Sequence, residues 1–185
     1  AARREILSSL LARTPHALVR VRARARVGLG LGYLVVGGVL EPVLDRAAIG
    51  QAAEMLGSSQ AAFEMTLEYL QSRKQFGQLI GSFQSLQHRA AKMFTELEMT
   101  RSCVAAALSA ADEGKTNVAE LASLAKARAS ELVHLVSNEC VQMHGGIGMT
   151  DVADPGLYMK RARTQEAMYG SASWHRDRYA KLNGY

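Results

Sequence analysis

Cysteines, aromatic residues and long apolar runs are all scarce in this chain of 185 residues. The two cysteines, Cys103 and Cys140, lie in separate helical patterns without paired spacing, which disfavours a disulfide scaffold and predicts reduced thiols in a cytoplasmic protein. No apolar run is long enough to span a membrane, and the N-terminus does not resemble a signal peptide. Aromatic residues make up 6% of the chain while alanine is abundant, a composition that suits closely packed helices.

The charge and the histidine pattern argue against two classes of function. The formal net charge is +5, but basic residues are interleaved with acidic ones over most of the chain, so nucleic acid is not expected as a partner. The five histidines do not show the spacing of metal ligands, so no metal site is expected. The length suffices for one domain with a proper core.

Residues 1–44 differ in pattern from the rest of the chain. Residues 1–13 could form a short amphipathic helix. Over residues 19–27, apolar residues alternate with arginines, which predicts a strand with one charged face. That face could bind a phosphate or an acidic partner, although a solvated sheet face is the favoured interpretation. The arginines are Arg20, Arg22, Arg24 and Arg26.

From Asp45 onwards the apolar residues recur at every third or fourth position, which predicts helices. Asp45, Ser82 and Asn117 are candidate N-caps, and Pro155 suits the first position of a helix. The predicted fold is mainly α: an antiparallel four-helix-type bundle over residues 45–185, preceded by a short β segment within residues 1–44. The expected helices cover residues 45–72, 83–111, 117–144, 154–169 and 171–182.

The junction between the first two long helices, Arg73–Gln87, gathers an arginine, two phenylalanines and several glutamines around two glycines. Arginine offers a fixed pair of donors to phosphate oxygens, phenylalanine a face for a ring, and glutamine both donors and acceptors for the edge of a heterocycle. An ordinary helix connector with a solvated Arg73 and a core Phe76 is the alternative, and this stretch alone does not decide between them.

A second motif, Gln142–Thr150, ends the third long helix with Gly-Gly-Ile-Gly. Glycines let backbone amides approach a ligand closely, but they also commonly end helices. The two motifs together are more specific. Arg-x-Gln-Phe-Gly from Arg73, then Phe-Gln from Phe83, then Gln-x-x-Gly-Gly-x-Gly-Met resemble, in order and spacing, the C-terminal helical domain of the acyl-CoA dehydrogenase family. The resemblance extends over residues 45–182.

The resemblance implies FAD-linked desaturation of acyl-CoA thioesters, in which a carboxylate removes the α proton and flavin N5 accepts the β hydrogen. It implies that Arg73 contacts the FAD pyrophosphate and that Phe76 packs on the adenine side. Gln142, Gly145 and Gly146 would line the adenosine end of FAD held mainly by a neighbouring subunit. A homo- or hetero-oligomer (dimer or tetramer), an acyl-CoA substrate and electron-transfer flavoprotein or another acceptor are therefore implied as partners.

The catalytic carboxylate of the family is missing from its usual places. Many members carry Glu in a Tyr-Glu-Gly-Thr stretch, where this chain has Met168-Tyr169-Gly170-Ser171, so Tyr169 stands at the Glu position. Other members carry it early in the first long helix, near Ala47 here. A phenol is a poor base at neutral pH. Glu166 is the nearest carboxylate, one helical turn earlier, although an exposed surface role is favoured for it.

Two functional hypotheses follow. The first is an acyl-CoA dehydrogenase family subunit that completes a partner's FAD site while the partner supplies the carboxylate. The second is a non-catalytic helical scaffold that kept the fold, and retention of Arg73, Phe76 and Gln142 argues against it. A basic nucleic-acid binder ranks below both. Family members are much longer, so the sequence is a fragment, lacks segments, or represents a reduced protein.

Overall fold

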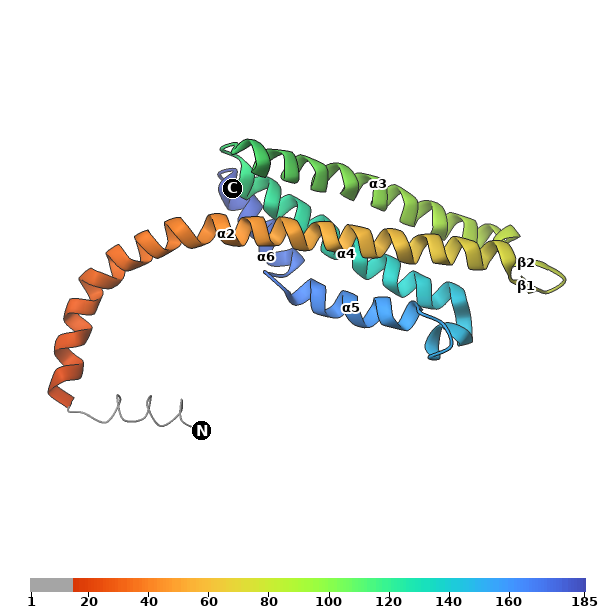
Figure 1. Ribbon diagram of the computed structural model, residues 1–185, viewed down its shortest axis with the longest axis horizontal. Helices are drawn as coiled ribbons and strands as arrows, with labels where there is room; N and C mark the ends of the chain where they lie inside the picture. Colours follow the sequence, from red (N-terminus) through yellow and green to blue (C-terminus); the bar gives the residue numbers. More distant parts are fainter. Residues whose placement is uncertain (1–14) are drawn as a thin grey trace. The chain divides into compact units, whose positions relative to one another are not determined.

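The structure, a computed structural model, describes the backbone of residues 15–185 and the side chains of residues 38–185 (Figure 1). The chain divides into two units between Pro42 and Val43. The longest helix, α2 (Pro15–Ser72), provides the whole described backbone of the first unit and continues into the second. The other helices are α3 (Gln84–Glu113), α4 (Val118–His144), α5 (Pro155–Ala167) and α6 (Ala172–Leu182), with short 3₁₀ turns η1 (Ile80–Ser82) and η2 (Gly145–Met149).

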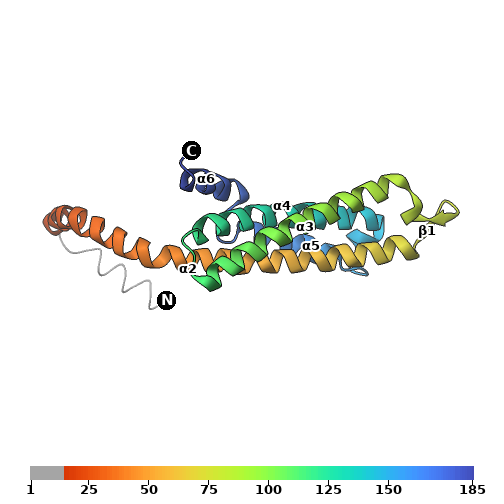
Figure 2. The ribbon, with the colours of Figure 1, turned by 90° about the horizontal axis from the view of Figure 1, so that it is seen from above.

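The mainly α, antiparallel bundle predicted from the sequence is confirmed for the second unit. Helix α4 packs against α3, α5 and α6, and Figure 2 shows α3 and α4 running alongside the later part of α2. Within the described residues, no helix has the length and apolar character needed to cross a membrane.

The strand expected over residues 19–27 is wrong, because these residues belong to α2. Arginine and alanine fill most of that stretch and both are strong helix formers, so its alternating pattern does not prevent a helix. The described strands lie elsewhere: β1 (Lys74–Gln75) and β2 (Gln78–Leu79) form an antiparallel hairpin after α2, with Gln75 opposite Gln78. The short helix predicted for residues 1–13 lies outside the described residues.

The core of the second unit consists of two apolar clusters along the bundle. One is rich in alanine, with Ala122, Ala125 and Ala129 of α4 buried against α2 and α3, so the helices can approach closely. The other has larger residues, including Phe63, Leu97, and Ile80 of η1. Small core side chains explain why so few aromatic residues suffice for this fold.

Two of the three proposed N-caps are wrong. Asp45 lies inside α2 and is buried, and its carboxylate pairs with Arg178 of α6. Ser82 donates to the carbonyl of Leu79, and α3 begins after Phe83 instead. Asn117 occupies the N-cap position of α4 but its side chain makes no capping hydrogen bond. Asp45 and Ser82 bind other partners instead, and the periodicity of the sequence does not predict those partners. The start of α5 at Pro155 is confirmed.

Gly81 of η1 is required by a close approach to α2. A Cβ at this position would lie 2.8 Å from the carbonyl oxygen of Leu70. The turn cannot easily retreat, because the amide of Ile80 donates to the carbonyl of Arg73 at 2.9 Å. We therefore expect Gly81→Ala to lower the free energy of unfolding by about 1–3 kcal/mol, measured by urea denaturation.

Gly57 is the matched control for this change. It is exposed in the middle of α2, with open space around an added Cβ. Gly57→Ala should raise the free energy of unfolding by about 0.5–1 kcal/mol, because alanine is the better helix former. Equal effects of the two substitutions would contradict the role given to the contact with Leu70.

Candidate functional site

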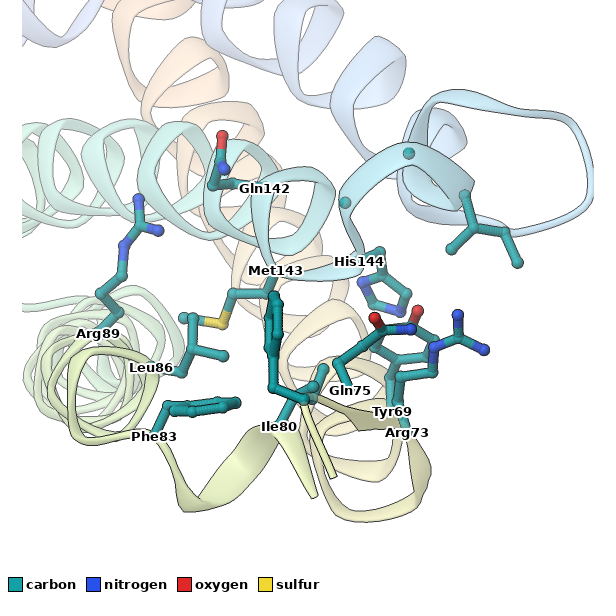
Figure 3. Close-up of a pocket in the computed structure, with 14 residues that line it drawn as sticks. Tyr69, Arg73, Gln75, Ile80, Phe83, Leu86, Arg89, Gln142, Met143 and His144 are labelled. Atoms are coloured by element: carbon teal, nitrogen blue, oxygen red, sulfur yellow. The ribbon is translucent and has the colours of Figure 1, made fainter. Parts of the chain in front are cut away.

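A pocket of about 530 Å³ lies between the hairpin that follows α2 and the C-terminal end of α4 (Figure 3). Its lining includes all five residues that the sequence singled out for cofactor contacts. These come from two motifs far apart in the chain, and the antiparallel course of α3 and α4 returns the second motif to the first. The five residues are Arg73, Phe76, Gln142, Gly145 and Gly146.

The hairpin holds Phe76 outwards. Phe76 and Gly77 both have positive φ, 54° and 80°, as a two-residue hairpin turn of type I′ requires. Such a conformation is uncommon for a phenylalanine. The Phe76 side chain is 90% exposed, and its ring meets the edge of Phe83 with centroids 6.1 Å apart. The interpretation as an ordinary connector predicted a core Phe76, but Phe76 is not a core residue. Its ring is therefore available to a ligand.

The pocket has an apolar floor between two polar sides. Figure 3 shows Ile80, Phe83, Leu86 and Met143 in the middle. Tyr69, Arg73, Gln75 and His144 lie together on one side, and Arg89 and Gln142 on the other. This arrangement suits a ligand with a flat apolar part and an anionic or hydrogen-bonding part.

Arg73 is held by its backbone and leaves its side chain exposed. Its amide donates to the carbonyl of Tyr69 and its carbonyl accepts from Ile80, both at 2.9 Å. Within residues 38–185, its guanidinium has no carboxylate partner. Arg89 on the opposite side differs, because it pairs with Glu139. Arg73 is thus the pocket arginine with its charge available to an anion.

His144 is a pocket residue that was not predicted from the sequence, where the histidines were of interest only as possible metal ligands. Its ring stacks on Tyr69 with centroids 4.4 Å apart, and its Nδ1 lies 2.7 Å from the carbonyl oxygen of Cys140. In a neutral ring, Nδ1–H donates to this carbonyl and Nε2 is the acceptor. The sequence could have indicated His144, because it lies between Gln142 and Gly145 in the second motif. Among the described residues, no group of His, Cys, Asp and Glu could hold a metal ion.

The glycine motif ends α4 and shapes the pocket. Gly145 adopts φ 64° directly after the helix, while Gly146 has open space around it. At Gly148 a Cβ would lie 2.8 Å from the carbonyl oxygen of Val141 and 2.9 Å from Cβ of His144. Gly148 therefore allows the chain to fold back against α4 and leaves room for His144.

Neither candidate for the catalytic base lines this pocket. Glu166 lies in α5, where its carboxylate accepts from Arg163 at 3.1 Å and is 3.2 Å from Nδ1 of His134. Tyr169 lies in the turn between α5 and α6 with 45% of its side chain exposed. The structure thus separates the predicted cofactor residues from the predicted acid–base position.

Two buried titratable residues beside this turn were not predicted from the sequence. Lys126 of α4 is fully buried, and its burial lowers the pKa of the ammonium group to about 8. His175 of α6 is buried as well, and burial lowers its pKa. The signal was present, because Lys126 lies in the alanine-rich stripe of α4, where a charged residue is out of pattern.

Comparisons with known proteins identify the family. The sequence profile described as acyl-CoA dehydrogenase, C-terminal domain, matches residues 38–182. The mitochondrial short/branched chain specific acyl-CoA dehydrogenase of Bos taurus is 36% identical over 138 residues, which are 75% of this chain and 32% of that protein.

Solved structures agree with this match. The butyryl-CoA dehydrogenase of Megasphaera elsdenii superposes with a TM-score of 0.76 at 30% identity, over 80% of this chain and 39% of that one. A chain of the ChsE4–ChsE5 complex of Mycobacterium tuberculosis has a TM-score of 0.72 at 26% identity, over 77% of this chain and 39% of that one. This chain therefore spans about a third of the length of such relatives.

Proposed function

The chain belongs to the acyl-CoA dehydrogenase family, and from this membership we propose that it is a subunit of an FAD-linked enzyme that desaturates acyl-CoA thioesters between the α and β carbons. One observation carries the proposal: the pocket at the end of α4 gathers Arg73 and Phe76 with the Gly145–Gly146 turn. A scaffold does not need a pocket that combines an exposed phenylalanine with an arginine lacking a carboxylate partner among residues 38–185.

The residues of the pocket fit the adenosine diphosphate part of FAD. The guanidinium of Arg73 would hold pyrophosphate oxygens, since it has the geometry for paired hydrogen bonds to phosphate. Phe76 would pack on the adenine, and Gln142, Gly145 and Gly146 would line the adenosine. When bound, FAD supplies the hydride acceptor of the reaction, and these residues orient it.

We assign the rest of the site to a neighbouring subunit. The exposed Phe76 projects from the hairpin, so it can reach a cofactor held mainly by another chain. A related structure is a complex of two proteins, ChsE4 and ChsE5, which supports a hetero-oligomer as readily as a homo-oligomer. The proposal includes an acyl-CoA substrate and electron-transfer flavoprotein or another acceptor. The free thiols of Cys103 and Cys140 support the cytoplasm as the compartment.

The catalytic carboxylate is proposed to come from the partner. Tyr169 occupies the usual position, and a phenol is a poor base at neutral pH. Glu166 is held by Arg163 and His134 on the surface of α4 and α5, away from the pocket.

The visible absorbance spectrum of the purified protein tests the proposal, recorded before and after anaerobic addition of mixed acyl-CoAs. We expect acyl-CoA not to bleach flavin bound to this chain alone. In the complex of this chain with its partner, acyl-CoA should bleach the flavin. Bleaching by the chain alone that Glu166→Gln abolishes would overturn the assignment of the base to a partner.

Arg73→Ala separates the cofactor site from a scaffold. A charge-assisted hydrogen bond contributes about 1.5–3 kcal/mol, so this variant should bind FAD roughly 10- to 100-fold more weakly in a fluorescence titration. Arg101→Ala is the control, because Arg101 lies on α3 outside the pocket and pairs with Glu98. Unchanged flavin binding and assembly in Arg73→Ala would favour the scaffold hypothesis.

A further inference from the structure

The turn between α5 and α6, Met168–Ser171, has a strained backbone. Tyr169 adopts φ 56° and Gly170 adopts φ 104°. A side chain at Gly170 would require Trp174 to move, since its Cβ would lie 2.9 Å from Cε3 of Trp174 and 3.2 Å from Nε2 of His175. Nothing comparable forces a large side chain onto the left-handed residue beside it, where glycine would avoid the strain. A tyrosine at this position therefore calls for an explanation beyond chain reversal.

Buried side chains hold this turn through its carbonyl groups. The ammonium nitrogen of Lys126 lies 3.0 Å from the carbonyl oxygen of Gly170, 3.5 Å from that of Glu166, and 3.1 Å from Oγ of Ser130. Nε2 of His175 lies 2.9 Å from the carbonyl oxygen of Tyr169. Both residues are at most 1% exposed. The turn is thus fixed from inside, while the side chain of Tyr169 remains half-exposed.

A role of Lys126 in the core alone does not explain this arrangement. Burying an ammonium group is unfavourable, and an apolar residue would fill the same space among the alanines of α4 without that penalty. The ammonium group reaches one carbonyl in the last turn of α5 and one in the turn itself. A cation placed there satisfies acceptors that the end of a helix leaves free.

We propose that Lys126 is a positioning residue: with His175, it holds the backbone of Tyr169 and Gly170 in the conformation that presents the Tyr169 side chain to a bound ligand. The identity of that ligand rests on the proposed function, in which Tyr169 stands where family members carry their base, so the side chain would face the acyl-CoA thioester. The hold itself is a property of this chain and does not depend on flavin or substrate.

Limited digestion with chymotrypsin, followed by mass spectrometry, tests the hold. Cleavage after Tyr169 requires the turn to open, whereas cleavage after the exposed Phe76 in the separate hairpin serves as the internal reference. In Lys126→Met, the ratio of the Tyr169 cut to the Phe76 cut should rise tenfold or more. In Lys160→Met, which changes an exposed lysine of α5, the ratio should remain that of the wild type.

An unchanged ratio in Lys126→Met would overturn the proposal. So would equally increased cleavage within α3 and α4, because Lys126 would then stabilise the bundle in general. If Lys126→Met does not fold, Lys126→Gln serves instead, because its shorter side chain cannot reach the carbonyl of Gly170. The same two outcomes then apply to it.

A pH series on the wild-type protein provides a readout that a packing role would not move. Burial lowers the pKa of Lys126 to about 8, so the charge on its hydrogen bonds is lost between pH 7 and 9. Opening the turn exposes Lys126 and returns its pKa to the ordinary value, so loss of the proton favours the closed turn. The cleavage ratio should therefore fall several-fold over this range, with the Phe76 cut correcting for the protease's own pH dependence. Glu166 of α5 and His175 of α6 act on or are acted on by Lys126, while Arg178 of α6 and Asp45 of α2 act on His175. His175 is neutral throughout the range because its pKa is lowered. A flat ratio would contradict the proposal.

Discussion

Asp45→Ala is expected to lower the free energy of unfolding by about 3–5 kcal/mol, because it leaves a partly buried arginine without its counter-ion. Asp45 is 6% exposed, and its carboxylate accepts from Arg178 through both oxygens, at 2.5 and 3.2 Å. Arg178 also donates to Ser123 at 3.1 Å. The pair joins α2 to α6, two helices far apart in the chain, so its loss should loosen the attachment of α6.

Urea denaturation followed by circular dichroism measures this effect. Glu54→Ala is the matched control, because Glu54 of α2 pairs with Arg161 of α5 while both side chains are more than 40% exposed. Removing an exposed pair costs about 0–1 kcal/mol. If the two variants lose the same stability, burial does not distinguish the pairs and the role assigned to Asp45 is wrong.

The stability of the wild-type protein relative to Lys126→Met should increase by about 2 kcal/mol between pH 7 and 9.5, since one pKa unit corresponds to about 1.4 kcal/mol. Burial lowers the pKa of Lys126 from 10.5 to about 8, and the nearby Glu166 carboxylate offsets only part of this effect. Between these two values the unfolded chain keeps a proton that the folded chain has lost. Folding stability therefore rises with pH through this window and is constant below it.

The measurement is the free energy of unfolding in urea at pH 7 and pH 9.5 for both proteins. Subtracting the values for Lys126→Met removes the contributions of all other titrating groups that the substitution leaves unaffected. A difference between the proteins that does not change with pH would show that the folded-state pKa of Lys126 is not lowered.

The helices and the two motifs that line the pocket were readable from the sequence because they depend on local patterns. Apolar residues repeat at helical spacing from Asp45 onwards, and α3 to α6 follow that pattern closely. The glycines after His144 and the Arg-x-Gln-Phe-Gly stretch signal their loops through residue type alone. The family resemblance rested on these motifs and is confirmed.

Local patterns misled where two structures were compatible with the same residues. The alternation over residues 19–27 has the period of a strand. Arginine and alanine are also strong helix formers, however, and the stretch belongs to α2. Asp45 resembles an N-cap by residue type, but Arg178 binds its carboxylate from more than 130 positions away. The fold determines which charged partner lies beside such a side chain, and the periodicity of the sequence does not predict that partner.

Only the tertiary structure therefore showed which distant residues lie close together. Arg73 and Gly145 share a pocket because two long antiparallel helices return the chain to its starting end. Lys126 reaches the carbonyl of Gly170 because α5 and α6 pack on α4. Residue type and spacing decide which segments become helices, since those preferences act within a few residues. Contacts between distant segments determine which charged side chains are buried and which groups they bind. These contacts form only in the folded protein, so the sequence pattern does not reveal them.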